Sequence, residues 1–337
     1  MGETRIRLAQ LHSMVVDALC AHGADADKAD LVAKALVAAE ADGLPGHGLS
    51  RLVSYCAQLA SGKIDGQAAP TASQVAEAAI IVDAKYGFAY PAVDLAIEKL
   101  VALTPKTGIA LAAITHSHHC GAAGYHVEAL ARQDLVGLMF ANTPKAIAPW
   151  GGTKGVFGTN PIAFAAPRVQ KEPLVIDLSL SKVARGKILV AHQQGQSIPG
   201  DWALDSRGKP TENPAAALSG TMLPIGEAKG TALALMVEIL AAALTASRFG
   251  SEASSFFSPD GSPPGVGQLL IAIAPDPVSN NHFETRLEDL IEAILSQRNT
   301  RLPGDRRLGL RKQVARKGII LTDRQYKQIV SLGHPKQ

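Results

Sequence analysis

A histidine between two glycines stands at a joint between two helical patterns. His47 lies between Gly46 and Gly48, and Arg51 follows it by four residues. A histidine with free space around it and a pKa near neutrality suits proton transfer. An arginine on the same side offers a planar fork for a carboxylate. Isolated surface histidines are more often structural than catalytic, so two interpretations stand: a proton-transfer site for a small carboxylic acid, and a structural joint.

The densest polar cluster of the sequence spans residues 115–126 and holds four histidines and Cys120. It follows a strand pattern and opens a helix whose first residues, Gly121 to Ala123, are small. Small residues in a first helical turn leave backbone N–H groups open to a phosphate. Histidine and cysteine also bind zinc, although no Cys-x-x-Cys or His-Glu-x-x-His spacing supports a metal site here. A polar turn with structural histidines is the third interpretation.

Three further segments carry residues that suit a ligand. A Gly-rich loop spans residues 151–161, and a polar stretch, 177–182, ends a buried strand pattern. Strand ends of open α/β sheets are common places for ligand contacts. Lys229 precedes a long apolar helix, where the helix dipole disfavours a cation unless an anion binds beside it. A solvated lysine is an equally good interpretation.

The usual nucleotide fingerprints are missing from the sequence. A Rossmann site needs G-x-G-x-x-G between a strand and a helix. The nearest candidate, Gly265-Val266-Gly267, precedes a strand pattern, and no G-x-x-x-x-G-K-[ST] segment occurs. A bound nucleotide would therefore use another scheme.

The elements that must position these residues fall into two regions. Helical spacing with strong stop signals predicts helices over residues 8–22, 25–43 (with Asp25 as N-cap) and 52–60. From residue 108 onwards, short apolar runs between turn residues predict strands. The predicted strands are an earlier one at 79–83 and then 109–114, 135–141, 162–166, 174–177, 188–191, 269–274 and 318–321. Further helices are predicted at 122–132, 231–245 and 283–296. A last helix follows Thr322, which forms a capping box with Gln325. We expect a surface excursion over 244–267, a Gly/Arg-rich turn before residue 318, and an α/β fold with a helical N-terminal region.

Composition excludes several classes of protein. The chain has 337 residues, about two domains by length, and a net charge of +3, which argues against nucleic acid as a partner. Hydrophobic residues make up 47%, which excludes disorder, and only 4% are aromatic. Three distant cysteines exclude a disulfide framework and fit a reducing cytoplasm. The charged N-terminus excludes a signal peptide, and Glu238 interrupts the longest apolar run, so we expect no membrane segment.

Five segments in this order resemble the type 2 malate/L-lactate dehydrogenase family. They are Asp42 with Gly46-His47-Gly48 and Arg51, then 118–123, 157–161, Gly226 with Lys229-Gly230, and 302–306. The resemblance spans nearly the whole chain. Residues 157–164 and 302–307 are especially similar to the branch that reduces Δ1-pyrroline-2-carboxylate and Δ1-piperideine-2-carboxylate.

The resemblance implies a fold, a reaction and an assembly. The fold would be a non-Rossmann NAD(P)-binding α/β fold with a mixed or antiparallel sheet. Residues 1–112 with 285–337 would form a helical substrate and dimerisation domain, and 113–284 the NAD(P)-binding domain. The enzyme would be an NADPH-dependent reductase of cyclic imino acids, forming L-proline and L-pipecolate by hydride transfer, in a cytoplasmic homodimer without a metal. NADH in place of NADPH, and a malate/L-lactate-type 2-hydroxyacid dehydrogenase, stay open as alternatives.

The resemblance also assigns roles by position. His47 would be the proton donor, while Arg51 and Thr159 would bind the substrate. The positions that would bind the cofactor are His119, Cys120, Gly121, Ala122, Ala123, Asp177, Leu178, Ser179, Ala228, Lys229, Gly304, Asp305, Arg306, Arg307, Leu308, Gly309 and Leu310.

Three positions depart from the imino-acid branch. Gly46 stands where a relay serine is common, Lys187 where a relay aspartate is found, and Leu180 where a polar substrate contact is frequent. A cyclic imine can arrive already protonated, so a weakened relay mildly favours an imine substrate. A non-catalytic homologue and a zinc hydrolase built on the 116–126 cluster are the interpretations from other classes.

Overall fold

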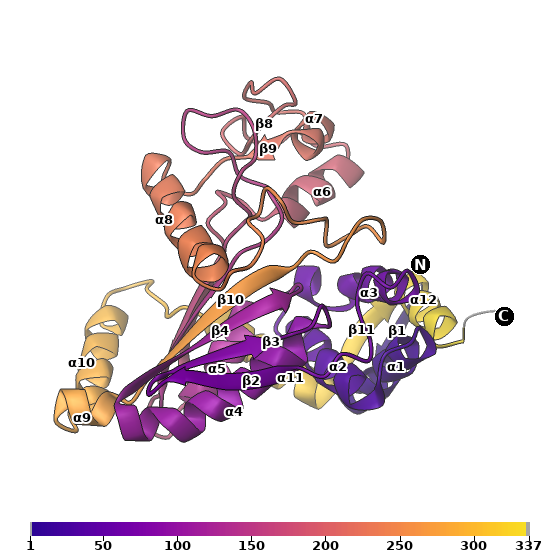
Figure 1. Ribbon diagram of the computed structural model, residues 1–337. Coiled ribbons are helices and arrows are strands. Elements are labelled where there is room, and N and C mark those ends of the chain that lie inside the picture. Colours follow the sequence, from indigo (N-terminus) through magenta and orange to yellow (C-terminus); the bar gives the residue numbers. More distant parts are fainter. Residues whose placement is uncertain (1, 335–337) are drawn as a thin grey trace.

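A seven-stranded mixed sheet forms the centre of the computed structural model, which describes residues 2–334 (Figure 1). Only the pair β3–β4 is parallel, and every other neighbouring pair is antiparallel. In spatial order the strands are β2 (Thr71–Ala76), β3 (Ala79–Asp83), β4 (Ile109–Ser117), β10 (Val266–Ile273), β5 (Val136–Ala141), β6 (Ile162–Ala166) and β7 (Leu174–Leu178). The expected α/β class with a mixed sheet is therefore confirmed.

Both faces of the sheet are covered by helices. In β10 the side chain of Leu269 packs on one face and that of Leu270 on the other, as the two-residue period of a strand requires. Helices α4 (Ala89–Thr107) and α5 (Ala123–Ala131) cover one face, where alanines allow close packing. Helix α8 (Ala228–Glu238) and the π-helical turn Ile239–Ala243 cover the other face.

A helical lobe adjoins one end of the sheet (Figure 1). Buried residues of α1 (Leu8–Ala21) include Leu11, Val15 and Leu19, whose spacing puts them on one helical face. That face packs against α2 (Ala26–Ala41), α3 (Leu52–Ala60) and α12 (Asp323–Gly333). Each such leucine or valine contributes about 1.5–3 kcal/mol of burial. The ribbon of β1 (Glu3–Ile6) and β11 (Ile319–Thr322) joins the two ends of the chain in this lobe.

Two smaller parts complete the molecule. A cap above the sheet holds α6 (Arg185–Gln193), α7 (Pro214–Ser219), β8 (Ala203–Leu204) and β9 (Thr221–Met222) around its own small core (Figure 1). An arm of α9 (Pro275–Ser279) and α10 (Phe283–Leu295) lies at the end of the sheet away from the helical lobe. The arm is tied to the sheet by a bidentate ion pair in which Arg168 donates to Glu288 at 2.7 and 2.9 Å.

Most predicted elements are confirmed within one or two residues. Strands 79–83 and 162–166 and helix 52–60 have the predicted bounds. The Asp25 side chain caps α2, and Thr322 forms the capping box with Gln325. Residues 244–265 contain no helix or strand, as expected for the surface excursion.

Two predicted elements are wrong. Residues 188–191 belong to helix α6, because a short apolar run has no periodicity that distinguishes a strand from a helix. The Gly/Arg-rich turn is helix α11 (Asp305–Lys317), with Asp305 in its first turn and Arg316 and Lys317 in its last. Those charges complement the helix dipole and stabilise a segment that lacks an apolar face. Helix α4 has no counterpart among the predictions.

Cys20, Cys56 and Cys120 are free thiols, as their spacing indicates. Within residues 2–334, no helix combines the length and apolar character needed to cross a bilayer. The domain division stays a prediction, and its boundary after residue 112 falls inside β4.

Candidate active site

Five strand ends meet at one edge of the sheet. Ser117 at the end of β4 pairs with Val266, which begins β10, and Ala141 at the end of β5 pairs with Gln268. Ile162, which begins β6, pairs with Leu178 at the end of β7. Neighbouring strands lie about 4.8 Å apart, so this edge extends for about 19 Å from β4 to β7. This edge therefore brings together residues that are far apart in sequence: His118, His119, Thr159 and residues 177–179.

The helical lobe contributes His47 and Arg51 through two short 3₁₀ turns, Pro45–His47 and Leu49–Arg51, that lead into α3. The backbone N–H of Leu49 donates to the Glu40 carboxylate at 2.8 Å, and the Ser50 hydroxyl donates to the Pro45 carbonyl at 2.6 Å. These side-chain bonds hold a glycine-rich segment that has little packing of its own.

Arg51 is fixed on two sides. Its Nε donates to the Gly46 carbonyl at 2.7 Å, and its guanidinium carbon lies 4.4 Å from the centre of the Phe257 ring. Stacking on an aromatic face holds the planar fork of an arginine in one orientation. Within residues 2–334, no hydrogen bond or ion pair joins Arg51 to a carboxylate, so its charge is available to an anionic ligand.

His47 and His119 stack with their ring centres 5.5 Å apart and 9° between the ring planes. Nδ1 of His47 is buried and has no hydrogen-bond partner in the described part of the chain. Burial, followed by the charge of Arg51, lowers the pKa of His47 to about 4. The imidazole is therefore neutral at pH 7, which suits a group that accepts a proton.

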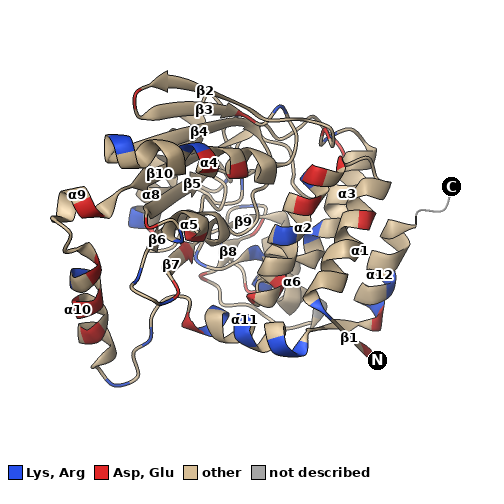
Figure 2. Ribbon diagram, turned by 90° about the horizontal axis from the view of Figure 1, so that it is seen from below, with Lys and Arg blue, Asp and Glu red and all other residues tan. Residues whose placement is uncertain are grey.

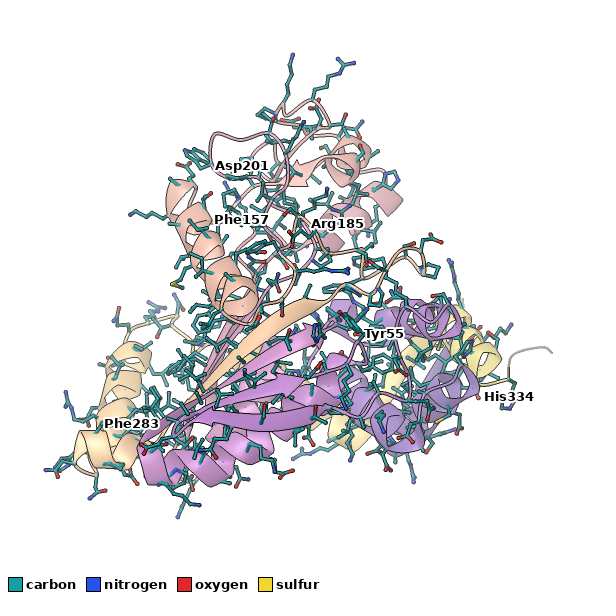
Figure 3. The ribbon with its side chains drawn as sticks, in the orientation of Figure 1. Tyr55, Phe157, Arg185, Asp201, Phe283 and His334 are labelled. Carbon is teal, nitrogen blue, oxygen red and sulfur yellow. The ribbon has the colours of Figure 1, made fainter. Side chains whose placement is uncertain are left out.

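Two tyrosines support His119 from behind. The Tyr55 hydroxyl lies 2.6 Å from Nδ1 of His119 and 3.0 Å from the Tyr90 hydroxyl, and all three side chains are buried. Burial raises the pKa of both Tyr55 and Tyr90, and burial lowers that of His119. The chain of three groups is neutral. Tyr55 lies where the helical lobe meets the sheet (Figure 3).

The other three histidines of the 115–126 cluster have separate partners. His116 lies 3.0 Å from Asp83, His118 lies 2.7 Å from the Gln58 amide oxygen, and His126 lies 2.7 Å from the Cys120 carbonyl. Among residues 2–334, no group of three or more histidine, cysteine or carboxylate side chains is arranged to hold a metal ion. The geometry therefore favours the structural interpretation for these three side chains.

The loop that carries Thr159 is held by a buried carboxylate. The Thr159 N–H donates to Oγ1 of Thr143 at 2.9 Å, and the Asn160 amide donates to Glu238 at 2.7 Å. Asn160 has a positive φ of 39°, and a Cβ at Gly158 would overlap the Thr143 carbonyl. Leu180, by contrast, is fully buried in the core beside α8 and touches no open space.

The expected cofactor positions are spread along the same edge and on α11. Backbone at Gly46, Gly226 and Gly309 faces open space in which a Cβ would meet no atom within 4 Å. Such uncovered backbone fits a ligand with phosphates, and Lys229 is exposed in the first turn of α8. At α5, however, the Gly124 N–H already donates to the Asp177 carboxylate at 2.7 Å. That N–H is therefore not free for a phosphate.

Arg307, one of the expected cofactor positions, belongs to a buried ion cluster. It lies 3.3 Å from Glu128 and 3.8 Å from Asp42, while Arg311 donates to both carboxylates at 2.6 to 3.0 Å. Its hydrogen bonds to the Asp42 and Glu128 carboxylates raise the pKa of Arg311. Figure 2 shows the basic residues of α11 beside α2 and α5. The cluster fastens α11 to the helices that frame the site, and Arg306 is exposed.

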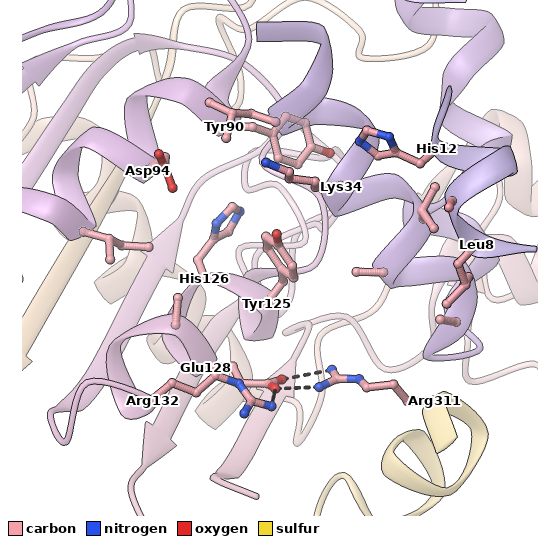
Figure 4. Close-up of a pocket in the computed structure, with 17 residues that line it drawn as sticks. Leu8, His12, Lys34, Tyr90, Asp94, Tyr125, His126, Glu128, Arg132 and Arg311 are labelled. Carbon is pink, nitrogen blue, oxygen red and sulfur yellow. Dashed lines mark hydrogen bonds and ion pairs between the residues drawn. The ribbon is translucent and has the colours of Figure 1, made fainter. Parts of the chain in front are cut away.

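A cavity lies between the helical lobe and the helices on one face of the sheet (Figure 4). It has a volume of about 590 Å³ between α1, α2, α4, α5 and α11, and Tyr90, His126 and Arg311 line it. None of His47, Arg51, His119 and Thr159 lines this cavity.

Sequence reasoning missed four residues of the site: Tyr55, Tyr90, Phe257 and Glu238. Tyr55 had a readable signal, because it follows Arg51 by four residues, as Arg51 follows His47. The other three reach the site through contacts between distant segments, for which the sequence holds no local pattern.

A sequence model described as malate/L-lactate dehydrogenase matches residues 6–330. A (2R)-3-sulfolactate dehydrogenase (NADP(+)) of Chromohalobacter salexigens is 50% identical over 308 residues, covering 91% of this chain and 92% of the relative. A Δ1-pyrroline-2-carboxylate/Δ1-piperideine-2-carboxylate reductase of Pseudomonas putida is 39% identical over 329 residues, covering 97% and 96%. The solved structure of Δ1-piperideine-2-carboxylate reductase from Pseudomonas syringae has a TM-score of 0.93 at 38% identity, covering 98% and 99%.

Proposed function

Because the chain belongs to the malate/L-lactate dehydrogenase family of oxidoreductases, we propose that it interconverts a small 2-hydroxy acid and its 2-oxo acid with NADP(H). The first substrate to test is (2R)-3-sulfolactate, on which the 50% identical relative acts by its name. This choice reverses the order in which the sequence resemblance ranked the two substrate classes.

The observation that carries the proposal is a neutral histidine beside an arginine without a carboxylate partner. Arg51, His47 and His119 form a site whose only fixed charge is positive, since no carboxylate contacts them within residues 2–334. Such a site attracts the carboxylate of a 2-hydroxy acid. It disfavours a protonated cyclic imine, which brings a positive charge to the reacting centre.

In the proposed reaction, Arg51 binds the substrate carboxylate and Thr159 is a further substrate contact. His47, neutral at pH 7, accepts the proton of the 2-hydroxyl group in the oxidation and returns it in the reduction. A carboxylate on Arg51 offsets the charge that lowers the His47 pKa, so substrate binding makes His47 a stronger base. When bound, the nicotinamide supplies the acceptor for the hydrogen on C2.

The proposed cofactor site keeps the positions named from the resemblance: 119–123, 177–179, 228–229 and 304–310. Open backbone at Gly226 and Gly309 and the exposed Lys229 support it. We also propose that the binding scheme is not that of Rossmann folds. The single parallel strand pair and the missing glycine fingerprint support this, because a Rossmann site is built on successive parallel strands.

Reduction of cyclic imino acids is the second candidate, favoured by the relatives named for Δ1-pyrroline-2-carboxylate. Nδ1 of His47 has no hydrogen-bond partner in the described residues, so no relay supplies this histidine with a proton. This supports imine reduction, since an imine that arrives protonated needs no proton donor. We further propose a homodimer in the cytoplasm. The three free thiols support the compartment, and the exposed Leu290 on the α10 arm supports a partner surface.

A panel of substrates run with both cofactors tests the proposal. Oxidation of (2R)-3-sulfolactate, malate and L-lactate is followed with NADP⁺ and NAD⁺, and reduction of the two cyclic imino acids with NADPH and NADH. We expect turnover of a 2-hydroxy acid with NADP⁺. Turnover of imino acids alone would establish the second candidate.

Variants of the site residues make the assignment specific. His47→Ala should lower kcat by about 10²–10⁴-fold, the usual contribution of a general base. Arg51→Ala should mainly raise KM for the acid. Full activity in both variants would show that the site lies elsewhere.

A further inference from the structure

His119 is held by a hydrogen-bonded chain that the acid–base step at His47 does not use. The chain runs from the Tyr90 hydroxyl to the Tyr55 hydroxyl over 3.0 Å, and from Tyr55 to Nδ1 of His119 over 2.6 Å. Tyr55 is fully buried, and Tyr90 and His119 are 3% and 6% exposed. Three polar groups placed so deeply require a satisfied hydrogen-bond pattern.

The direction of the protons along this chain follows from the available acceptors. Tyr90 has no hydrogen-bond partner other than Tyr55 in the described residues. If His119 donated from Nδ1 to Tyr55, then Tyr55 would donate to Tyr90, and the Tyr90 hydroxyl hydrogen would have no protein acceptor within residues 2–334. A buried donor without an acceptor costs about 1–3 kcal/mol. In the opposite direction Tyr90 donates to Tyr55, Tyr55 donates to Nδ1 of His119, and every hydroxyl hydrogen is used.

An imidazole that accepts at Nδ1 and stays neutral carries its hydrogen on Nε2. Nε2 of His119 has no hydrogen-bond partner among residues 2–334, and this atom is not fully buried. Solvent therefore reaches this nitrogen. The ring lies parallel to that of His47, 5.5 Å away, so the donor borders the same space as the proposed base.

We propose that His119 donates its Nε2–H to the oxygen on C2 of the substrate, and that Tyr55 and Tyr90 are positioning residues that fix this tautomer. The inference rests on the proposed function above. As His47 takes the proton of the 2-hydroxyl group, negative charge builds on that oxygen, and a neutral imidazole N–H stabilises it.

Nitrogen NMR of the full-length protein with ¹⁵N-labelled histidine tests the tautomer without any turnover. The His119 signals are identified by their loss in His119→Gln. We expect Nδ1 without a hydrogen and Nε2 with one in the wild type, and a mixture of both tautomers in Tyr55→Phe. Tyr86→Phe, which changes a half-exposed tyrosine whose ring lies tilted beside that of His116, is the matched control and should leave the signals unchanged. A hydrogen on Nδ1 in the wild type overturns the inference.

Contact with the substrate is tested in a complex that cannot react, the 2-hydroxy acid together with NADPH. Adding the acid should shift the His119 Nε2 resonance relative to the complex with NADPH alone, and a resonance that saturating acid leaves unchanged overturns the donor role. Tyr55→Phe should lower kcat for 2-hydroxy acid oxidation about 10-fold with a smaller change in KM. Absence of turnover in a wild type that keeps the expected tautomer would overturn the proposed function and leave the tautomer assignment standing.

Discussion

The rings of His47 and His119 lie parallel, 9° apart, with their centres separated by 5.5 Å. The two imidazoles come from different parts of the fold, one from a 3₁₀ turn of the helical lobe and one from the end of β4. Their stacking joins the lobe to the edge of the sheet at the point where the proposed substrate binds. A shift of the lobe would separate the proposed base from the proposed donor.

The pH dependence of oxidation should report the lowered pKa of His47. Below its pKa the imidazole is charged and accepts no proton, so kcat/KM should stay level from pH 7 towards pH 5 and fall only as pH approaches about 4. In Arg51→Gln, loss of the neighbouring cation should move this fall to higher pH. Rate measurements across this range in both proteins check the shift, with the exposed Arg298→Gln as control. A fall centred at pH 6.5 in the wild type would contradict the assignment.

Acid should destabilise the protein well before its carboxylates are protonated. Burial lowers the pKa of His118 to about 3 and that of His126 to about 4. Between pH 6.5 and these values the unfolded chain binds protons that the folded chain does not, so stability is full above pH 6.5 and falls as pH falls. Each histidine contributes up to about 1.4 kcal/mol per pH unit.

Urea unfolding at pH 7, 6 and 5 measures this slope. In His126→Gln, whose amide can still donate to the Cys120 carbonyl, the slope should decrease by about 1.4 kcal/mol per pH unit. His192→Gln changes an exposed side chain and should leave the slope as it is. An equal decrease in both variants would mean that the buried His126 is not responsible.

Loss of Arg311 should strongly destabilise the fold. Asp42 and Glu128 are 6% and 5% exposed, and each accepts two hydrogen bonds from this guanidinium. Arg311→Met leaves Asp42 with only the more distant Arg307, and Glu128 with Arg307 and the half-exposed Arg132, which should cost about 3 kcal/mol of unfolding free energy. Arg286→Met breaks an exposed pair with Asp289 and should cost under about 1 kcal/mol. Equal losses by denaturant titration would contradict the role of the cluster.

Gly46→Ser separates the two substrate classes. A Cβ at Gly46 meets no atom within 4 Å and the φ is not positive, so the variant should fold with unchanged stability. It introduces the serine hydroxyl that the resemblance to imino-acid reductases leads us to expect at this position. Alone or with Lys187→Asp, the substitution should raise turnover of cyclic imino acids. It should leave the rate of 2-hydroxy acid oxidation within about threefold of the wild type. A large loss of 2-hydroxy acid turnover would show that the proposed reaction depends on the bare glycine.

Local signals account for the parts of the fold that sequence predicted well. Asp25 and Thr322 each satisfy a helix end within three residues of themselves, so their caps are readable without knowledge of the fold. The Gly46–Arg51 joint is readable for the same reason. Helix α11 was missed because the ion pairs of Arg307 and Arg311 with Asp42 and Glu128 hold it, and these join residues far apart in sequence.

The two tyrosines that position His119 also depend on contacts that the sequence does not show. Tyr55 stands one helical turn beyond Arg51, within reach of pattern reasoning. Tyr90, however, lies at the start of α4, a helix that the sequence did not predict, and only the packing of α4 against the lobe brings its hydroxyl to Tyr55. Which tautomer His119 adopts depends on that distant contact.

The ribbon that joins β1 to β11 has a consequence for the order of folding during synthesis. Glu3 pairs with Thr322, and Ile319, Leu321 and Ile329 belong to the same core as Ile6 and Leu11. Helices α1 to α3 therefore complete their core only after residues 319–329 have been synthesised. The joint that carries His47 belongs to this lobe, so the proposed base reaches its final surroundings only after residues 319–329 are in place.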